Sequence, residues 1–322
     1  MSLAEAKPRI LLATDGSRGA VEAEAYAFAL AQSWPAALTV MHVLEFPPGL
    51  DPESPVNRLY LGEMTKRATH ELAKLKARTA DRGISVQPKI ATGIPSEGVL
   101  AAASAEDPDL IVVGTRGKTG LAHVLLGSTA ERIIRAAPCP VLAVRAEGTG
   151  EEPADQSRRD HAALHRLLVP IDFSDCSLDA LEYGAMVAKR LNASVKILHV
   201  LEPVSYGLDF TLSHVETRES IKTVLTKRLS DVVSALTSAG LASDFLIVGG
   251  LPADSILDAA TAQGIDVIVM GTHGRRGLSR TLFGSVTESV LRRSSCPVLT
   301  VRSPKFRPGH RRVLSRESPT DV

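Results

Sequence analysis

Residues 114–129 read GTRGKTGLAHVLLGST, and residues 271–286 read GTHGRRGLSRTLFGSV. Both segments follow a short apolar run and obey the pattern G-x2-G-x9-G-S. In the first segment, Gly114 and Gly117 can bring the backbone close to a ligand, because glycine has no Cβ in the way. The pattern therefore predicts a strand end followed by a loop whose amides face a phosphate group.

The Gly-Ser pair that closes each segment predicts the start of a helix, at Gly127-Ser128 and at Gly284-Ser285. The unpaired N–H groups and the positive dipole end of a helix bind anions, and the serine hydroxyl is a further donor. Glycines after a strand and a serine N-cap also occur without any ligand. The complete spacing is present twice, which favours a nucleotide over that alternative.

The glycine segments belong to a longer internal repeat. Asp15 and Asp172 are 157 positions apart, and the glycines of the two segments are separated by the same number of positions. Residues 111–145 are identical to residues 268–302 at 18 of 35 positions, without a gap. The chain thus consists of two copies of one domain. We divide it into domain 1 at 1–145, a polar linker at 146–164, domain 2 at 165–302 and a basic tail at 303–322 that we expect to be disordered.

Short β-branched runs alternate with helical stretches in each copy. This order predicts two tandem α/β domains with open, parallel, Rossmann-like sheets of five strands and helices on both faces. The ligand site of such a sheet lies at the carboxyl ends of its strands. In the first copy we predict strands at 9–14, 37–44, 84–92, 110–114 and 141–145, and helices at 19–33, 57–82, 96–105 and 128–136.

Other nucleotide motifs do not fit. The run Gly117-Lys118-Thr119 is similar to the end of a Walker A loop, but Val112 stands where that loop needs its first glycine. The turn after the first strand lacks the G-x-G-x-x-G of a dinucleotide fold. His42 and His199 lie on apolar strands, and we expect them to be packed and hydrogen-bonded rather than to act as ligands or bases.

With these motifs, both copies resemble the ATP-binding branch of the universal stress protein family, including the strands after Cys139-Pro140 and Cys296-Pro297. The resemblance implies that the aspartate after the first strand binds adenine and that two backbone positions contact it. It also implies that the glycine loop and the Gly-Ser pair hold the ribose and phosphates. The implied nucleotide-binding positions are Ala13, Asp15, Val43, Gly114, Thr115, Arg116, Gly117, Gly127, Ser128 and Thr129 in the first copy, and Pro170, Asp172, Val200, Gly271, Thr272, His273, Gly274, Gly284, Ser285 and Val286 in the second.

Two of these assignments carry an alternative or a departure from the family. Proline is common in the family where Ala13 stands, but a backbone contact tolerates the change. Asp15 and Asp172 could instead be N-caps of the helices that follow them. Related proteins pair their domains through the last strands, so residues 141–145 and 298–302 are expected to pair within one chain, and a homodimer is a further expectation.

Composition excludes several classes of function. The 37 basic and 36 acidic residues leave a net charge of +1, so no global field exists to hold nucleic acid or an anionic membrane. Three cysteines without a C-x-x-C pair argue against a disulfide framework. No stretch approaches the roughly 18 apolar residues of a membrane span, and no signal-peptide core is visible. We expect a cytoplasmic protein.

The glycine segments lack the parts of a fast enzyme. Neither contains an Asp or Glu between its first glycine and its serine. Glu131 and Glu288 are expected to be capping-box partners of Ser128 and Ser285. We therefore expect no catalytic residue and no metal cluster, but an ATP-binding protein, with Mg²⁺ as an accompanying ion, that senses or signals stress through an unidentified protein partner. The alternatives are a slow ATPase and a nucleotide-free interaction scaffold.

Overall fold

A computed structural model describes most of the chain, in two compact units. Unit 1 comprises residues 1–163 and 291–300, and unit 2 comprises residues 164–290 and 301–322. For residues 213–219 only the backbone is described. The described ranges are 7–47, 49–80, 82–115, 126–145, 164–202, 213–273 and 284–302.

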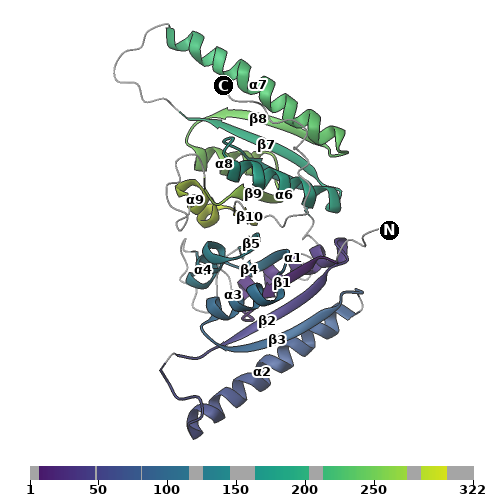
Figure 1. The fold of residues 1–322 in the computed structure, drawn as a ribbon, viewed down its shortest axis with the longest axis vertical. Coiled ribbons are helices and arrows are strands. Elements are labelled where there is room, and N and C mark those ends of the chain that lie inside the picture. Colours follow the sequence, from purple (N-terminus) through teal and green to yellow (C-terminus); the bar gives the residue numbers. More distant parts are fainter. Residues whose placement is uncertain are drawn as a thin grey trace. The chain divides into compact units, whose positions relative to one another are not determined.

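Strands and helices alternate along unit 1 (Figure 1). The strands are short and almost fully buried at its centre, where the LIVV run of β4 and the VLAV run of β5 have no exposed residue. The elements are β1 (Arg9–Ala13), α1 (Arg18–Ser33), β2 (Ala37–Glu45), α2 (Pro55–Ala80), β3 (Val86–Gly93), α3 (Pro95–Glu106), β4 (Leu110–Gly114), α4 (Ser128–Ala136) and β5 (Val141–Val144).

The sheet of unit 1 has the strand order β3-β2-β1-β4-β5-β10. Strands β1 to β5 are parallel, and β10 (Val298–Val301) adds to β5 in the antiparallel direction. Val298 lies opposite Ala143, and the Thr300 hydroxyl donates to the Val141 carbonyl at 3.2 Å. This is the pairing expected between the last strands of the two copies.

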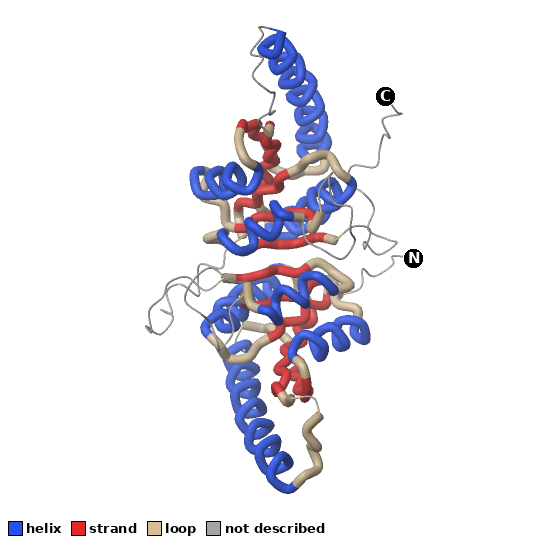
Figure 2. Tube along the Cα trace, turned by 90° about the vertical axis from the view of Figure 1, so that its left-hand side faces the viewer, coloured by secondary structure: helices blue, strands red, loops and turns tan. Residues whose placement is uncertain are grey.

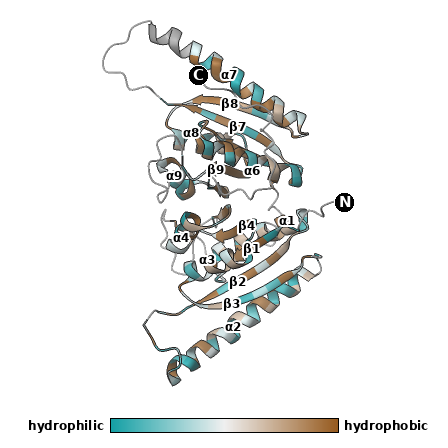
Figure 3. Cartoon of the chain, in the orientation of Figure 1, coloured by the Kyte–Doolittle hydropathy of each residue, from teal (hydrophilic) through white to brown (hydrophobic). Residues whose placement is uncertain are grey.

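Helices cover both faces of the sheet, as Figure 2 shows from a second direction. In unit 1, α1 packs against β4 and α2 against β3, whereas α3 and α4 pack against each other. Figure 3 shows why: β4 is mostly hydrophobic along its length, whereas hydrophobic and hydrophilic residues alternate along α2. A strand covered on both faces must be apolar throughout, whereas a surface helix needs one apolar stripe.

Unit 2 repeats this arrangement, with the strand order β9-β6-β7-β8. All three of its strand pairings are parallel where they are described. Its elements are β6 (Arg166–Pro170), α6 (Asp175–Leu191), β7 (Ser194–Leu201), α7 (Ser213–Ser238), β8 (Ser243–Gly249), α8 (Pro252–Ala262), β9 (Val267–Gly271) and α9 (Ser285–Arg293). The predicted α/β fold with mostly parallel sheets and helices on both faces is confirmed.

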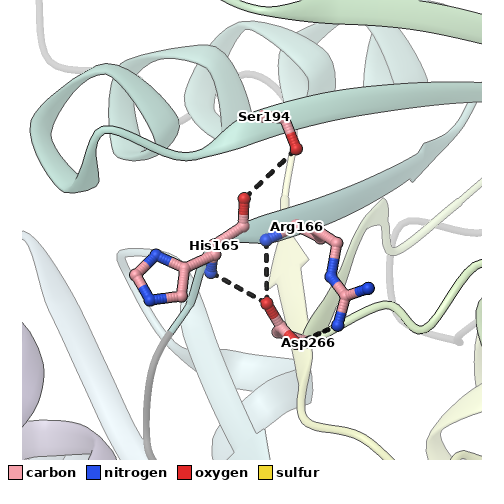
Figure 4. Close-up of polar contacts among 4 residues, drawn as sticks. All are labelled: His165, Arg166, Ser194 and Asp266. Atoms are coloured by element: carbon pink, nitrogen blue, oxygen red, sulfur yellow. Dashed lines mark hydrogen bonds and ion pairs between the residues drawn. The ribbon is translucent and has the colours of Figure 1, made fainter.

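An aspartate fastens the start of the first strand in each unit. Asp266 Oδ2 accepts hydrogen bonds from the His165 and Arg166 N–H groups, both at 2.9 Å (Figure 4). Asp109 Oδ2 accepts from the Arg9 N–H at 2.9 Å in unit 1. Both carboxylates lie at the amino ends of the parallel strands, so they stabilise the edge of the sheet opposite the predicted ligand edge.

The described residues contain no helix that is long and apolar enough to cross a membrane. The three cysteines are free thiols, and Cys176 is buried while Cys139 and Cys296 are partly exposed.

Candidate functional site

The strand order places the predicted site residues of unit 1 at one edge of the sheet. β1 lies between β2 and β4, with Ala13 opposite both Met41 and Val113. The chain leaves β1 toward β2 on one side, and β4 lies on the other side. Such a switch in strand order opens a crevice at the carboxyl ends of the strands, where ligands of open α/β sheets bind. Asp15 follows β1, Val43 lies two residues before the end of β2, and Gly114 ends β4.

The aspartate loop of unit 1 is held by short-range hydrogen bonds. Thr14 N–H donates to the Met41 carbonyl at 2.9 Å, which ties the loop to β2. Asp15 Oδ1 accepts from the Ser17 N–H at 2.9 Å, while its Oδ2 has no partner among the described residues. Gly16 between them has a φ of +72°, a conformation that glycine adopts without strain. The half-buried carboxylate therefore uses one of its two oxygens within the described loop.

The aspartates are not the helix caps. Ser17 is the N-cap of α1, and its side chain accepts from the Ala20 N–H at 3.3 Å. Ser174 caps α6 in the same way, accepting from the Ser177 N–H at 3.3 Å. Of the two roles left open by the sequence, the structure therefore assigns helix capping to the serines.

The aspartate of unit 2 has the same place in its loop. Ile171 N–H donates to the Leu198 carbonyl at 2.8 Å, so the loop after β6 is tied to β7. Asp172 Oδ1 accepts from both the N–H and the hydroxyl of Ser174, at 3.0 and 2.5 Å. Pro170 ends β6, and Val200 lies one residue before the end of β7.

Gly114 and Gly271 are needed for a reason that the sequence pattern did not indicate. A Cβ on Gly114 would lie 2.5 Å from the Gly19 carbonyl carbon and 2.8 Å from the Ala20 nitrogen, both in the first turn of α1. A Cβ on Gly271 would lie 2.7 Å from Cys176 Sγ at the start of α6. These glycines let the helix start pack against the strand end, and thereby position the aspartate loop.

Gly127, not Ser128, is the N-cap of α4. Its N–H donates to the Thr115 carbonyl at 2.8 Å, and its carbonyl accepts from the Glu131 N–H at 2.9 Å. Thr115 N–H in turn donates to the Val144 carbonyl at 2.8 Å. The amides of the first helical turn, from Ser128 onward, precede the first intrahelical donor and point away from the helix.

The predicted capping box is therefore wrong. A capping box needs serine at the N-cap and glutamate three residues later, whereas Ser128 is already the first helical residue. Glu131 instead accepts from Arg135 Nη2 at 2.7 Å. The helix start is decided by the bond between Gly127 and Thr115, which the local sequence does not contain. Ser128 is exposed and Thr129 is half-buried.

Unit 2 builds the same helix start. Gly284 N–H donates to the Thr272 carbonyl at 2.9 Å, and the Gly284 carbonyl accepts from the Glu288 N–H at 3.0 Å. Ser285 is thus the first residue of α9, so the capping box predicted for it is also wrong. Thr287 is buried, and its hydroxyl donates to the Gly271 carbonyl at 2.9 Å, which fixes the helix to the end of β9.

His273 presents an unused polar atom at this edge. Its Nδ1 is hydrogen-bonded to the Thr272 hydroxyl at 2.9 Å, whereas its Nε2 is buried and has no hydrogen-bond partner in the part of the chain that the structure describes. A buried nitrogen without a partner costs about 1–3 kcal/mol, so a ligand atom that binds it would recover that free energy. Its counterpart Arg116, with Gly117 and Gly274, lies outside the described residues.

The shifted pKa values found elsewhere belong to exposed ion pairs and do not indicate a second binding site. The pKa of the Glu63 carboxyl is lowered by its hydrogen bond to Lys66, on the exposed surface of α2. The pKa of the Glu71 carboxyl is lowered by Lys74 in the same way. Among the described residues, no group of three His, Cys, Asp or Glu side chains could hold a metal ion.

Comparison with known proteins finds one family in both halves of the chain. The model of the universal stress protein family matches residues 8–145 and again residues 163–302. A universal stress protein of Methanocaldococcus jannaschii is 34% identical over 138 residues, which is 42% of this chain and 81% of the relative. A universal stress protein of Mycobacterium tuberculosis is 29% identical over 276 residues, which is 82% of this chain and 87% of the relative.

Solved structures agree on the fold. The crystal structure of a universal stress protein from Archaeoglobus fulgidus superposes with a TM-score of 0.70 at 24% identity, covering 92% of this chain and 99% of that one. The crystal structure of a putative universal stress protein from Pseudomonas aeruginosa gives a TM-score of 0.62 at 20% identity, over 92% of this chain and 94% of that chain.

Proposed function

We propose that this chain, which belongs to the universal stress protein family, binds one adenine nucleotide in each of its two units and signals through the nucleotide-bound state. The observation that carries the proposal is the repeated geometry at the switch in strand order. In both units an aspartate loop, the end of the second strand and a glycine-capped helix start follow adjacent strands of one sheet. One ligand of nucleotide size can contact all three parts.

Each part has a chemical role in this proposal. Asp15 and Asp172 accept a hydrogen bond from the adenine amino group. Backbone groups contact the base at Ala13 and Val43 in unit 1, and at Pro170 and Val200 in unit 2. The phosphates bind the first-turn amides of α4 and α9, where the helix dipole favours negative charge. Ribose and phosphate contacts are assigned to Gly114, Thr115, Arg116, Gly117, Gly127, Ser128 and Thr129, and to Gly271, Thr272, His273, Gly274, Gly284, Ser285 and Val286.

ATP fits this set of groups better than a nucleoside alone. The first turn of each helix offers several N–H donors, and His273 Nε2 adds a further polar atom in unit 2. Both are suited to oxyanions rather than to an apolar ligand. A Mg²⁺ ion would come with the phosphates and their waters, as is usual for this cation, and would neutralise part of the phosphate charge.

A binding role is favoured over rapid catalysis. Phosphoryl transfer needs a residue that orients the nucleophile, in addition to charge on the γ-phosphate. Among the described residues, the carboxylate of unit 1 closest in sequence to the helix start is Glu131, which is paired with Arg135. A slow ATPase is the alternative that the same site would support. Whether the chain only binds ATP or hydrolyses it slowly, a protein partner would distinguish the nucleotide-bound chain from the empty one.

Mass spectrometry of the small molecule released on denaturation tests the proposal. The purified protein should release an adenine nucleotide, or should take up ATP when it is supplied. Release of a different class of molecule would overturn the nucleotide assignment. Protein that neither releases nor takes up a nucleotide would support the interaction-scaffold alternative instead.

A further inference from the structure

In unit 2 three side chains from different elements stack beside the aspartate loop. The guanidinium carbon of Arg228, on α7, lies 3.9 Å from the centre of the Phe173 ring. The Phe173 ring also contacts the His199 ring, with 5.3 Å between the ring centres and a 45° angle between the planes. An arginine at this distance over an aromatic face is attracted by the electrostatics of the ring.

The stack holds the residues on both sides of Asp172. Phe173 follows Asp172 directly, while the His199 ring is buried on β7 and its Nδ1–H donates to the Ile171 carbonyl at 2.8 Å. His199 therefore fixes Ile171, the residue before the aspartate, through a hydrogen bond. Phe173, the residue after the aspartate, is held by the contacts of its ring with His199 and Arg228. Any movement of Arg228 or of α7 acts on the loop that carries the proposed adenine contact.

The backbone of Phe173 is strained, which makes the stack necessary. Phe173 has a φ of +61°, in the left-handed region that bulky residues avoid at a cost of about 1–3 kcal/mol. Such a conformation persists only where the surroundings hold it. Here those surroundings are the His199 ring on one side and the Arg228 guanidinium on the other.

Unit 1 lacks this stack, so the two copies differ at an otherwise equivalent position. Gly16 occupies the place of Phe173, with a φ of +72°, and Glu71 occupies the place of Arg228. The loop of unit 1 is instead fixed by a polar contact, in which the Thr14 hydroxyl donates to the buried Glu24 carboxylate at 3.2 Å. The long helix of unit 2 contacts its aspartate loop through a ring that unit 1 does not have.

We propose that the Arg228–Phe173–His199 stack couples the long helix α7 to the nucleotide site of unit 2. This rests on the proposed function, and it makes Phe173 and Arg228 positioning residues for Asp172. Nucleotide at the second site stabilises the loop, and the ordered loop keeps the Phe173 ring in place for Arg228, so α7 becomes more tightly docked. By reciprocity, docking of α7 raises the affinity of the second site. In unit 1 the connection to α2 is polar instead, because Arg78 on α2 lies 3.8 Å from the buried Glu24 carboxylate that accepts from Thr14.

Hydrogen exchange during an ATP titration tests the coupling, because peptides from each unit report on their own site. ATP should slow exchange in the Asp172 loop and in the part of α7 around residues 225–232. In Arg228→Ala the affinity of the second site should fall about 3- to 10-fold, the effect of losing a cation–π contact, and the protection of α7 by ATP should disappear. Phe173→Gly, which installs the residue of unit 1, should do the same.

Lys227→Ala is the matched control, because it removes one positive charge from the adjacent exposed position on α7. It should leave affinity and protection as in the wild type. Unchanged second-site affinity and α7 protection in both Arg228→Ala and Phe173→Gly would overturn the coupling while leaving the nucleotide site intact. A loss in Lys227→Ala equal to that in Arg228→Ala would also overturn it, because bulk charge would then explain the effect. Wild-type protein without any ATP response would refute the proposed function itself.

Discussion

Replacing Gly114 with alanine should destabilise unit 1 and weaken nucleotide binding at its site. The new Cβ would lie 2.5 Å from the Gly19 carbonyl carbon, 2.6 Å from its oxygen and 2.8 Å from the Ala20 nitrogen. All three atoms belong to the backbone of α1, so no side-chain rotation can relieve the overlap. Carbon atoms pack at about 3.5 Å or more, and α1 would have to move by about 1 Å.

The expected cost follows from this overlap. Overpacking of a buried position typically costs about 1–3 kcal/mol, and the backbone contacts place Gly114→Ala at the upper end, at about 3 kcal/mol. For a unit of this size, that loss corresponds to a fall in Tm of about 6–12 °C. Because α1 begins just after the aspartate loop, its displacement should also weaken nucleotide binding in unit 1.

Tryptophan fluorescence reports the unfolding of unit 1 separately from that of unit 2. Trp34 is the only tryptophan of the chain, it is 2% exposed, and it belongs to unit 1. Thermal unfolding followed through Trp34 should shift in Gly114→Ala. Gly62→Ala is the matched control, because Gly62 lies within α2 and a Cβ there has nothing within 4 Å. It should raise stability slightly, by up to about 1 kcal/mol. Equal unfolding temperatures for Gly114→Ala and the wild type would refute the close approach of β4 and α1.

Three further predictions follow from the described contacts. Asp266→Ala should lower the free energy of unfolding of unit 2 by about 1–3 kcal/mol, because two backbone N–H groups lose their acceptor, and calorimetry should show this with ATP affinity unchanged. Thr287→Val should cost about 1 kcal/mol by removing the buried bond to the Gly271 carbonyl, and should weaken ATP at the second site only. ATP turnover with magnesium should stay far below about one per second, the lower end of the usual enzyme range, and a steady-state phosphate-release assay showing many turnovers per second would contradict the binding role.

The layered fold was predictable because its signals are local. Residues 110–114 and 128–136 were predicted as a strand and a helix and have these same bounds in β4 and α4. A short, uninterrupted apolar run between loop signals indicates a strand that is buried on both faces, and the internal repeat provides each such signal twice. The switch in strand order between β1 and β4 then places the aspartate and glycine segments at one edge.

The features that sequence reasoning missed depend on partners distant in the chain. Ser128 was a sound N-cap candidate, but the bond from Gly127 to the Thr115 carbonyl moves the helix start by one residue. The role of Gly114 in receiving α1 and the contact of Arg228 with Phe173 also arise only in three dimensions. The implied contacts of Arg116, Gly117 and Gly274, which lie outside the described residues, stay predictions.

The stoichiometry of ATP binding tests the central claim most directly. Isothermal titration of nucleotide-stripped protein should give two ATP per chain. Asp15→Ala should remove or weaken the first site and leave one, and Asp172→Ala should do so for the second, while the double variant should bind neither tightly. Fewer than one ATP per wild-type chain, or a stoichiometry that neither aspartate changes, would contradict the account of two equivalent edges that each hold a nucleotide.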